Sequence, residues 1–304
     1  MEVRIERDEL GEVAIPPRRY WGARTERRRT AADAGLEPLP GELIRAFGIF
    51  KKAAARVNYD CDPARMTEEK CAAIFAAADE LIRGKRREDF PLPVWQTGMQ
   101  ANDNVNEVIA NRGSEMANTP ELVRPEEVDL SLAPERAFPA AARIAAALAV
   151  ADDILPAAEA MAARRGSDAL KSACALLRDA LAGLFRLPPI AVEGTAEGFD
   201  ALVAEQTAKL TDKPFTAGDD AACELADLRR AHDAMRALSG ELERVCEGEA
   251  REAAVMTSVQ LSGIGAALSA AAARSEAERR TLLPLCAYDF LQSARLLGSL
   301  LATD

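Results

Sequence analysis

Apolar residues recur at three- and four-residue spacing from residue 41 onward, which is the spacing of a helix that buries one side. In residues 41–58 the apolar side contains Leu43, Ile44, Phe47 and Ala54. Another periodic run covers residues 62–84, where we expect Asp62 to cap the helix, Pro63 to take its first position and Gly84 to end it. A further helix is expected to start near Asn104.

The second part of the chain consists of longer periodic runs that are rich in Ala and Leu. The expected helices cover residues 138–165, 167–185, 198–210, 220–247, 249–273 and 276–301, with a kink or break at Pro156 in the first of them. Small residues at helical spacing allow such helices to approach closely, as in a bundle. We place a boundary near Val123, between an N-terminal domain of residues 1–123 and a long-helix domain of residues 124–304.

Strand signals are confined to the start of the chain. Residues 3–15 have the only convincing alternation of apolar and polar positions. Residues 90–98 are expected to be extended, because Pro91 and Pro93 bias their neighbours away from helix. The pattern therefore predicts an all-α fold with an irregular N-terminal part.

Composition and charge exclude several classes of function. The chain has 304 residues and a net charge of −11, which disfavours nucleic-acid binding. Six scattered cysteines without a C-x-x-C pair indicate reduced core thiols, and a single histidine, His232, argues against a metal site. The charged first residues and the lack of a run of membrane-spanning length predict a cytoplasmic protein with no membrane partner. We expect no cofactor.

Side-chain amides are concentrated in one segment, VWQTGMQANDNVNEVIANR, which covers residues 94–112. It contains four asparagines, Asn102, Asn104, Asn106 and Asn111, together with two glutamines. Amides both donate and accept hydrogen bonds, so such a cluster can fix irregular backbone to a helix start. The same groups could bind a small polar ligand, and the residues alone leave both readings open.

The same segment resembles the first conserved segment of the fumarase/aspartase superfamily, in particular of the class II fumarate hydratases. Similar stretches run along nearly the whole chain: RDELGEVAIPPRRYWGART (7–25), FPAAARIAAALAVADDILPAAEAM (138–161), VAEQTAKLTDKPF (203–215), AHDAMRALSGELERV (231–245) and AYDFLQSARLLGSLL (287–301). The resemblance implies an all-α fold with a central bundle of long helices, and a small C-terminal domain that this sequence lacks. It also implies tetramers and a reversible addition or elimination across the double bond of fumarate or a similar product.

The segments that carry the family's chemistry are altered. Where the family reads WQTG-SGTQ-S-N, this chain reads WQTGMQAND, with Met99 at a serine position. The family's H-P-N-D becomes RPEE, with Arg124 in place of the histidine, and its Ser-Ser-Asn becomes Ala133, Pro134 and Glu135. Hydroxyl and amide donors are thereby lost and acids are gained, which opposes the binding of a dianion.

Two further family segments have no counterpart in this sequence. The G-R-T-H segment should precede AVEGTAEGFD (191–200), and the G-S-S-x-M-P-x-K-x-N loop, which supplies the family's base, should follow SGELERV (239–245). Removing one positioned donor can cost ~10²–10³ in rate. We therefore expect a catalytically inactive member with no catalytic residue, acting as a structural or regulatory subunit that forms tetramer-like homo-oligomers.

Two alternatives stay open. One is an active lyase with a rebuilt site for a small dicarboxylate. Its candidate substrate-binding residues are Asn102, Asn104, Asn106, Arg124, Glu135 and Arg136. The other is a hetero-oligomer in which a full-length family member completes the site.

Overall fold

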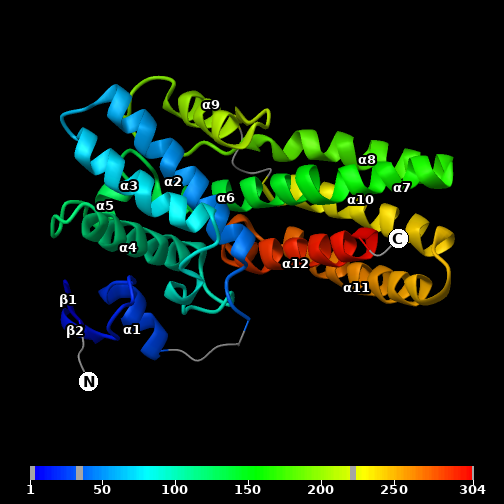
Figure 1. Ribbon diagram of the computed structural model, residues 1–304, viewed down its shortest axis with the longest axis horizontal. Helices are drawn as coiled ribbons and strands as arrows, with labels where there is room; N and C mark the ends of the chain where they lie inside the picture. The colour runs from blue at the N-terminus through cyan, green and yellow to red at the C-terminus, as the bar shows by residue number, and fades with distance from the viewer. Residues whose placement is uncertain (1–3, 32–36, 220–223, 303–304) are drawn as a thin grey trace. The chain divides into compact units, whose positions relative to one another are not determined.

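The computed structural model describes residues 4–31, 37–219 and 224–302, and within them the predicted all-α fold is confirmed (Figure 1). The chain forms two compact units. Unit 1 comprises Met1–Ala141 and Pro188–Asp219, and unit 2 comprises Ala142–Leu187 and Asp220–Asp304. The first division lies later than the boundary that we placed near Val123, inside a continuous helix, and the chain later returns to unit 1.

Unit 1 begins with a β-hairpin, as the alternating pattern suggests. Strand β1 (Arg4–Asp8) pairs antiparallel with β2 (Gly11–Ile15), and Arg4 lies opposite Ile15. Gly11 has a φ of 106° at the turn, a conformation that L-residues rarely adopt. The hairpin is followed by α1 (Ala23–Ala31).

The core of unit 1 is formed by helices that pack side by side. They are α2 (Gly41–Cys61), α3 (Glu68–Ile82), α4 (Gly98–Met116), the short α5 (Pro125–Val128), the first turns of α6 (Pro134–Leu148), and α9 (Phe199–Thr211). A short 3-10 turn, η1 (Arg87–Asp89), precedes α4. Glycines allow two close approaches to α3: a Cβ at Gly113 of α4 would lie 2.7 Å from the carbonyl oxygen of Ala73, and a Cβ at Gly48 of α2 would lie 3.0 Å from that of Ala78. Phe47 of α2 packs edge-on against Phe138, with 5.9 Å between ring centroids.

Two predicted helix starts in unit 1 are wrong. Asp62 is the C-cap of α2, because its N–H donates to the carbonyl oxygen of Asn58, and α3 begins only at Glu68. The cap of α3 is Thr67, whose side chain accepts from the N–H of Lys70. Helix α4 begins at Gly98 and not near Asn104, so the amide-rich segment is helical throughout most of its length.

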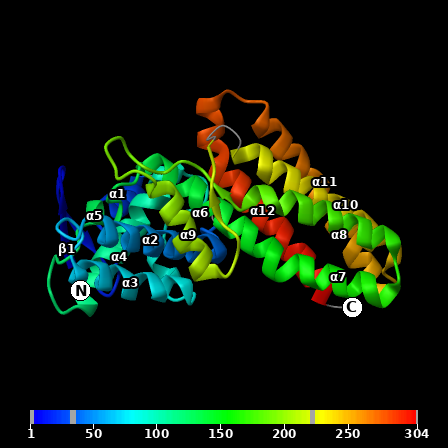
Figure 2. The ribbon, with the colours of Figure 1, turned by 90° about the horizontal axis from the view of Figure 1, so that it is seen from above.

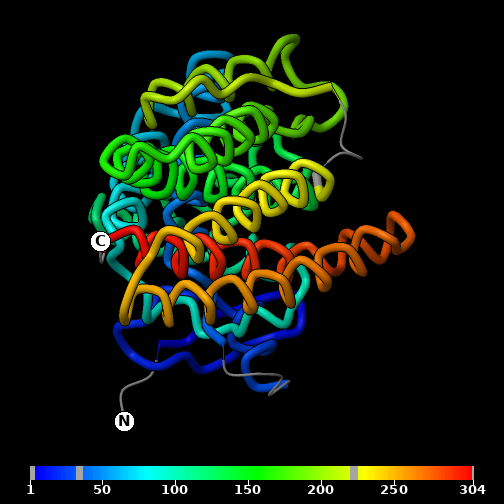
Figure 3. Tube along the Cα trace, turned by 90° about the vertical axis from the view of Figure 1, so that its right-hand side faces the viewer, coloured from blue at the N-terminus to red at the C-terminus, as the bar shows by residue number. Residues whose placement is uncertain are grey.

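Unit 2 is a bundle of long helices that closely match the predicted ranges. They are the rest of α6, α7 (Leu155–Arg165), α8 (Asp168–Leu184), α10 (Glu224–Val245), α11 (Gly248–Ala272) and α12 (Glu276–Ala302). The predicted start of α10 at Asp220 lies outside the described residues. Figure 2 shows α8, α10, α11 and α12 as roughly parallel rods, and Figure 3 shows α10, α11 and α12 following one another up and down the bundle. Short strands β3 (Arg186–Leu187) and β4 (Thr216–Ala217) lie in the connections.

The predicted break at Pro156 takes the form of a π-helix. Residues Ala149–Ile154 (η2) are wound more loosely than an α-helix, and Pro156, which has no backbone N–H, follows them in the first turn of α7. Further along, Ser167 caps α8 by accepting from the N–H of Leu170. These local signals explain why the helix ends agree with the sequence pattern.

The interior of unit 2 is apolar apart from a few polar groups, of which Arg143 and His232 have hydrogen-bond partners for some of their nitrogen atoms. Arg143 is 3% exposed and donates to the carbonyl oxygens of Gly183 and Arg186 and to the carboxylate of Asp227, at 2.7 Å in each case. His232 is completely buried, and its Nε2 lies 3.1 Å from Oγ of Ser293. Among the described cysteines all five are free thiols, and Cys223 lies outside the described residues.

Helix α11 exposes several apolar side chains on its surface. By length and composition α11 could cross a membrane, which corrects the expectation that no run of the sequence is long enough. A single helix of this kind is weak evidence for a membrane span, because the core helix of a soluble protein can have the same length and composition. Only 33% of its apolar window is buried. Val255, Met256 and Val259 are 38%, 68% and 69% exposed.

Candidate functional site

The amide-rich helix α4 points two of its asparagines at one carboxylate. Nδ2 of Asn102 and Nδ2 of Asn106 lie 2.7 Å and 2.6 Å from Oδ2 of Asp129, which follows α5. Asn102 is 0% exposed and Asn106 is 4% exposed. Because a carboxylate only accepts hydrogen bonds, both amides must present their NH₂ groups to Asp129.

The other oxygen of Asp129 contacts a buried cation. Nζ of Lys51, from the middle of α2, donates to Oδ1 of Asp129. Lys51 is completely buried, and burial lowers the pKa of its ammonium group while Asp129 raises it. The four side chains of Lys51, Asn102, Asn106 and Asp129, which we call the Asp129 cluster, therefore form one connected network within unit 1.

The remaining polar residues of α4 hold backbone. Asn104 donates to the carbonyl oxygen of Asp89 at 3.0 Å, and Asn111 donates to that of Tyr20 at 3.0 Å. Glu107 accepts from the N–H groups of Gly22, Arg24 and Thr25 at the start of α1. The interpretation of this segment as a brace for a helix start and a turn agrees with these bonds.

Glu107 sits in a space that only glycine leaves open. A Cβ at Gly22 would lie 2.6 Å from Cδ of Glu107, which is too close for two non-bonded carbons. Burial raises the pKa of the Glu107 carboxyl, against the lowering effect of the hydrogen bonds that it accepts. The carboxylate also faces the positive end of α1.

The three charged candidate residues, Arg124, Glu135 and Arg136, do not come together in one binding site. Arg124 caps α5, with its N–H on Glu127 and its Nη2 3.4 Å from Oε1 of Glu127. Glu135 is exposed and Arg136 is half-buried in the first turns of α6. The structure thus brings together Asn102 and Asn106 of the six predicted residues, around a carboxylate, and holds Asn104 and Arg124 in separate contacts.

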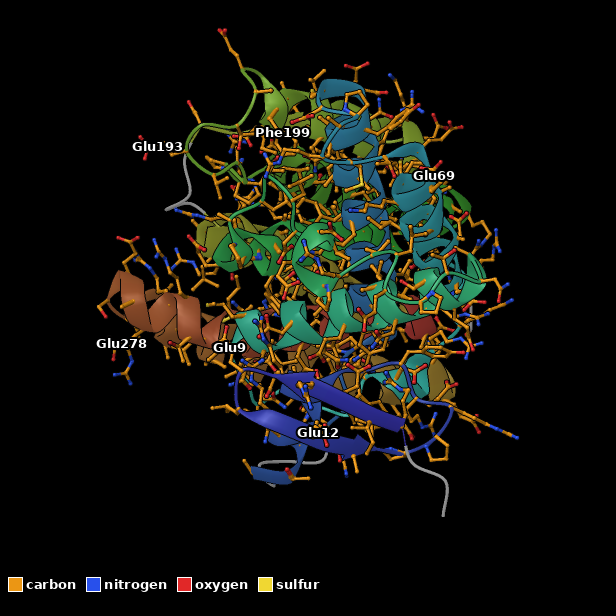
Figure 4. All side chains as sticks on the ribbon, turned by 90° about the vertical axis from the view of Figure 1, so that its left-hand side faces the viewer. Glu9, Glu12, Glu69, Glu193, Phe199 and Glu278 are labelled. Atoms are coloured by element: carbon orange, nitrogen blue, oxygen red, sulfur yellow. The ribbon has the colours of Figure 1, made fainter. Side chains whose placement is uncertain are left out.

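A cavity of about 530 Å³ opens beside the Asp129 cluster. It lies between the hairpin, the start of α1, one side of α4 and the segment that carries α5, all in unit 1. Its lining comprises Glu6, Arg7, Asp8, Glu9, Gly22, Ala23, Arg24, Asp103, Asn106, Glu107, Asn111, Glu121, Val123, Arg124, Pro125, Glu126, Asp129, Leu132 and Pro134. Figure 4 shows the hairpin alongside α4, with Glu9 labelled at the hairpin turn.

The lining of this cavity is strongly acidic. Eight of its residues are Asp or Glu, against three arginines, Arg7, Arg24 and Arg124. Each arginine already has a carboxylate partner: Glu12 for Arg7, Asp103 for Arg24 and Glu127 for Arg124. A dianion entering the cavity would meet like charge, which disfavours its binding.

The connection between α10 and α11 bears on the missing reactive loop. Helix α10 ends at Val245 and α11 begins at Gly248, so only Cys246 and Glu247 join them. The resemblance places the loop that carries the family's base directly after this part of α10. The position is therefore occupied by a two-residue link.

Sequence reasoning missed Lys51 and Asp129. Lys51 follows Ile44 and Phe47 at helical spacing on the apolar side of α2, and a lysine in that phase signals a buried cation that needs a partner. Asp129 gives no such signal, because it lies in the short stretch after α5.

Comparison with known proteins relates the chain to lyases. A family described as "Lyase" matches residues 11–173. The class II fumarate hydratase of Bacillus anthracis is 32% identical over 377 aligned positions, covering 98% of this chain and 81% of that protein. That of Thermus aquaticus is 35% identical over 296 positions, covering 81% of this chain and 62% of that protein. The 377 positions exceed the 304 residues of the chain, so that relative has internal segments without a counterpart in this chain.

Solved structures show the same fold. The class II fumarase of Schistosoma mansoni superimposes with a TM-score of 0.84 at 21% identity, over 99% of this chain and 82% of that chain. The native fumarate lyase:delta crystallin of Brucella melitensis gives a TM-score of 0.82 at 23% identity, over 100% of this chain and 87% of that chain.

Proposed function

The chain belongs to the fumarase/aspartase superfamily of lyases, and from that premise we propose that it is a member without lyase activity, serving as a structural or regulatory subunit. The observation that carries this proposal is the occupancy of the amide donors. Asn102 and Asn106 lie in the segment where the family binds substrate, yet both donate to Asp129 of the same chain. A substrate carboxylate would have to displace a carboxylate that is also paired with Lys51.

Two further features support an inactive protein. The cavity beside the Asp129 cluster is acidic, and its arginines are paired, so positive charge for a dianionic intermediate is not available in its lining. The link of Cys246 and Glu247 leaves no room for a loop that could carry a serine and a lysine.

A rebuilt lyase site receives less support from the geometry. It would need Arg124 and Arg136 to meet a dicarboxylate, but Arg124 is committed to Glu127, and Glu135 points into solvent. The acids around Arg124 oppose an anion more strongly than one guanidinium can attract it.

A direct assay tests the proposal. The purified chain is incubated with fumarate, malate, aspartate and argininosuccinate, and addition or elimination is followed by absorbance of the double bond. We expect no turnover above the buffer rate, with a full-length class II fumarate hydratase as the positive control. Turnover that Asn102→Ala and Arg124→Ala both abolish would show a rebuilt site and overturn the proposal.

We also propose that the protein works as an oligomer, with copies of itself or with a full-length relative, through the exposed side of α11. Residues 253–273 contain no charged side chain, and Val255, Met256 and Val259 project into solvent. Exposed apolar surface of this kind is typical of interfaces.

Sedimentation velocity tests the assembly. We expect Met256→Glu/Val259→Glu to dissociate the oligomer, whereas Leu176→Glu, at a residue that is 58% exposed on α8, leaves it intact. A wild-type monomer, alone and after mixing with the full-length enzyme, would contradict this proposal. Binding of wild type to liposomes through the same residues would contradict it as well.

A further inference from the structure

A second cavity of unit 1, of about 460 Å³, lies at the C-terminal end of α4. Its lining comes from the start of β1, the segment before α1, the last turns of α4 and the turn that follows α4. Two charged side chains of the lining, Arg18 and Glu121, are exposed, and within the described part of the chain neither has an ion pair or a hydrogen bond. They therefore line one cavity as opposite charges that do not pair with each other.

The same kind of turn presents both side chains. Residues 16–19 and 119–122 each form a four-residue turn, closed by a hydrogen bond of 3.3 Å from the last N–H to the first carbonyl oxygen. The second residue is proline in both turns, and the third is Arg18 or Glu121, with a φ of 68° and 53° respectively. A positive φ at this position favours glycine. Two charged residues thus occupy backbone positions where glycine would be less strained, and such strain is typical of functional sites.

The other charged residues of the lining have partners of opposite charge. The partners are Glu6 for Arg4, Glu88 for Arg19 at 3.8 Å, and Arg112 for Glu115. Within this lining, Arg18 and Glu121 are therefore the cation and the anion that remain without a partner.

From these observations we propose that the second cavity binds a free α-amino acid in its zwitterionic form. The guanidinium group of Arg18 can donate two hydrogen bonds to the carboxylate of the amino acid. The carboxylate of Glu121 can accept from its ammonium group. A simple anion or cation would leave one of the two side chains unpaired, whereas a zwitterion pairs both. This proposal goes beyond the absence of lyase activity and does not depend on it.

The end of α4 favours one orientation of the amino acid. Ser114 and Glu115 of its last turn line the cavity, and the C-terminal end of a helix carries a partial negative charge. This end is followed by the turn with Glu121, so the ammonium group is expected there and the carboxylate beside Arg18. The exposed amide of Asn118, which has no side-chain hydrogen bond within the described part of the chain, can donate to the ligand or accept from it.

Calorimetric titration with each of the common amino acids, at fixed ionic strength, tests the proposal. We expect at least one of them to bind saturably. Its carboxamide and its N-acetyl derivative each lack one of the two charges and should bind about tenfold more weakly.

Two variants connect each charge of the ligand to one side chain. Arg18→Gln should weaken binding of the amino acid about tenfold but leave binding of its carboxamide unchanged, because the carboxamide has no carboxylate for the guanidinium group. Glu121→Gln should likewise weaken the amino acid but leave its N-acetyl derivative unchanged. The matched control, Arg65→Gln/Glu193→Gln, removes one exposed charge of each sign outside the cavity and should change the affinity by less than about twofold. Equal urea midpoints of the variants would exclude a folding defect.

Several outcomes would overturn the inference. They are the absence of saturable binding for every amino acid, equal weakening by the control variant, and an Arg18→Gln effect that is the same for the amino acid and its carboxamide. Tighter binding of succinate or of spermidine than of any amino acid would assign the cavity to a simple anion or cation. None of these titrations requires lyase activity, so this inference and the proposed function fail separately.

Discussion

The ammonium group of Lys51 and the carboxylate of Asp129 form a buried ion pair in the centre of unit 1. The side chain of Lys51 is 0% exposed and that of Asp129 is 11% exposed. The two residues come from the middle of α2 and from the stretch after α5, and Asn102 and Asn106 of α4 complete the network. The Asp129 cluster therefore ties three segments of the chain together.

Breaking this pair should destabilise the protein strongly. Asp129→Asn leaves the Lys51 ammonium group buried without its anion, and we expect the free energy of unfolding to fall by about 3–5 kcal/mol. The double variant Lys51→Met/Asp129→Asn should lose less than Asp129→Asn alone, because no unpaired charge remains. Urea unfolding of the two single variants and the double variant measures the coupling. Strictly additive losses would mean that the two side chains do not interact.

Replacing Glu107 should loosen the start of α1. In Glu107→Gln one oxygen becomes an NH₂ group that faces the N–H donors of Gly22, Arg24 and Thr25, so we expect a loss of about 1–3 kcal/mol. Hydrogen exchange at these three amides should become faster. Glu88→Gln, at a side chain that is 51% exposed, is the matched control. Unchanged exchange in Glu107→Gln would contradict the proposed bracing of α1 by α4.

His232 should make unit 2 sensitive to acid. Burial lowers its pKa to about 4 from 6.5, so between these values the unfolded imidazole is protonated while the folded one stays neutral. The contribution of neutral His232 to the free energy of unfolding is present above pH 6.5. It is lost as the pH falls towards 4, by up to roughly 3 kcal/mol. Urea unfolding of wild type and His232→Gln between these two pH values tests this, and the variant should show the flatter dependence. A variant that is equally sensitive to acid would rule the effect out.

Asp289 should have the opposite effect on the pH dependence of stability, making unit 2 less stable as the pH rises. Burial raises its pKa to about 6 from 3.8, so the folded carboxyl stays protonated where the unfolded one is ionised. Its contribution is fully present below pH 3.8 and is lost as the pH rises through about 6. Asp289→Asn should remove this loss, so its stability relative to wild type should increase from pH 4 to pH 7. A constant difference between the two proteins over this range would show that Asp289 does not titrate abnormally.

The sequence predicted helices well where the end signals are local. Ser167 marks the start of α8, Gly84 follows the end of α3, and Pro156 follows the π-helix. It failed at Asp62 because a good capping residue also occurs where the preceding helix ends, and Thr67 a few residues later was the better cap. Local sequence patterns specify where a helix ends, whereas the choice between two possible capping residues depends on packing.

The candidate site was predicted less completely, because its decisive contacts are distant in sequence. The asparagines of α4 stood out in the sequence, but the residue that they hold, Asp129, is separated from them by a loop and a short helix. The acidity of the cavity depends on the hairpin, α4 and the segment around α5 meeting in space. No periodicity in the sequence encodes such a meeting of segments.

The short link between α10 and α11 also makes this point of unit 2 suitable for the insertion of a longer loop. Cys246 and Glu247 join two antiparallel helices that pack against each other along their length, so their ends are already held together. Closing an inserted loop between fixed ends becomes only slowly more costly as the loop grows. A loop from an active relative, inserted between these two residues, should leave both helices folded. The activity of such a variant would show how much lyase activity one restored loop gives to a protein that otherwise has none.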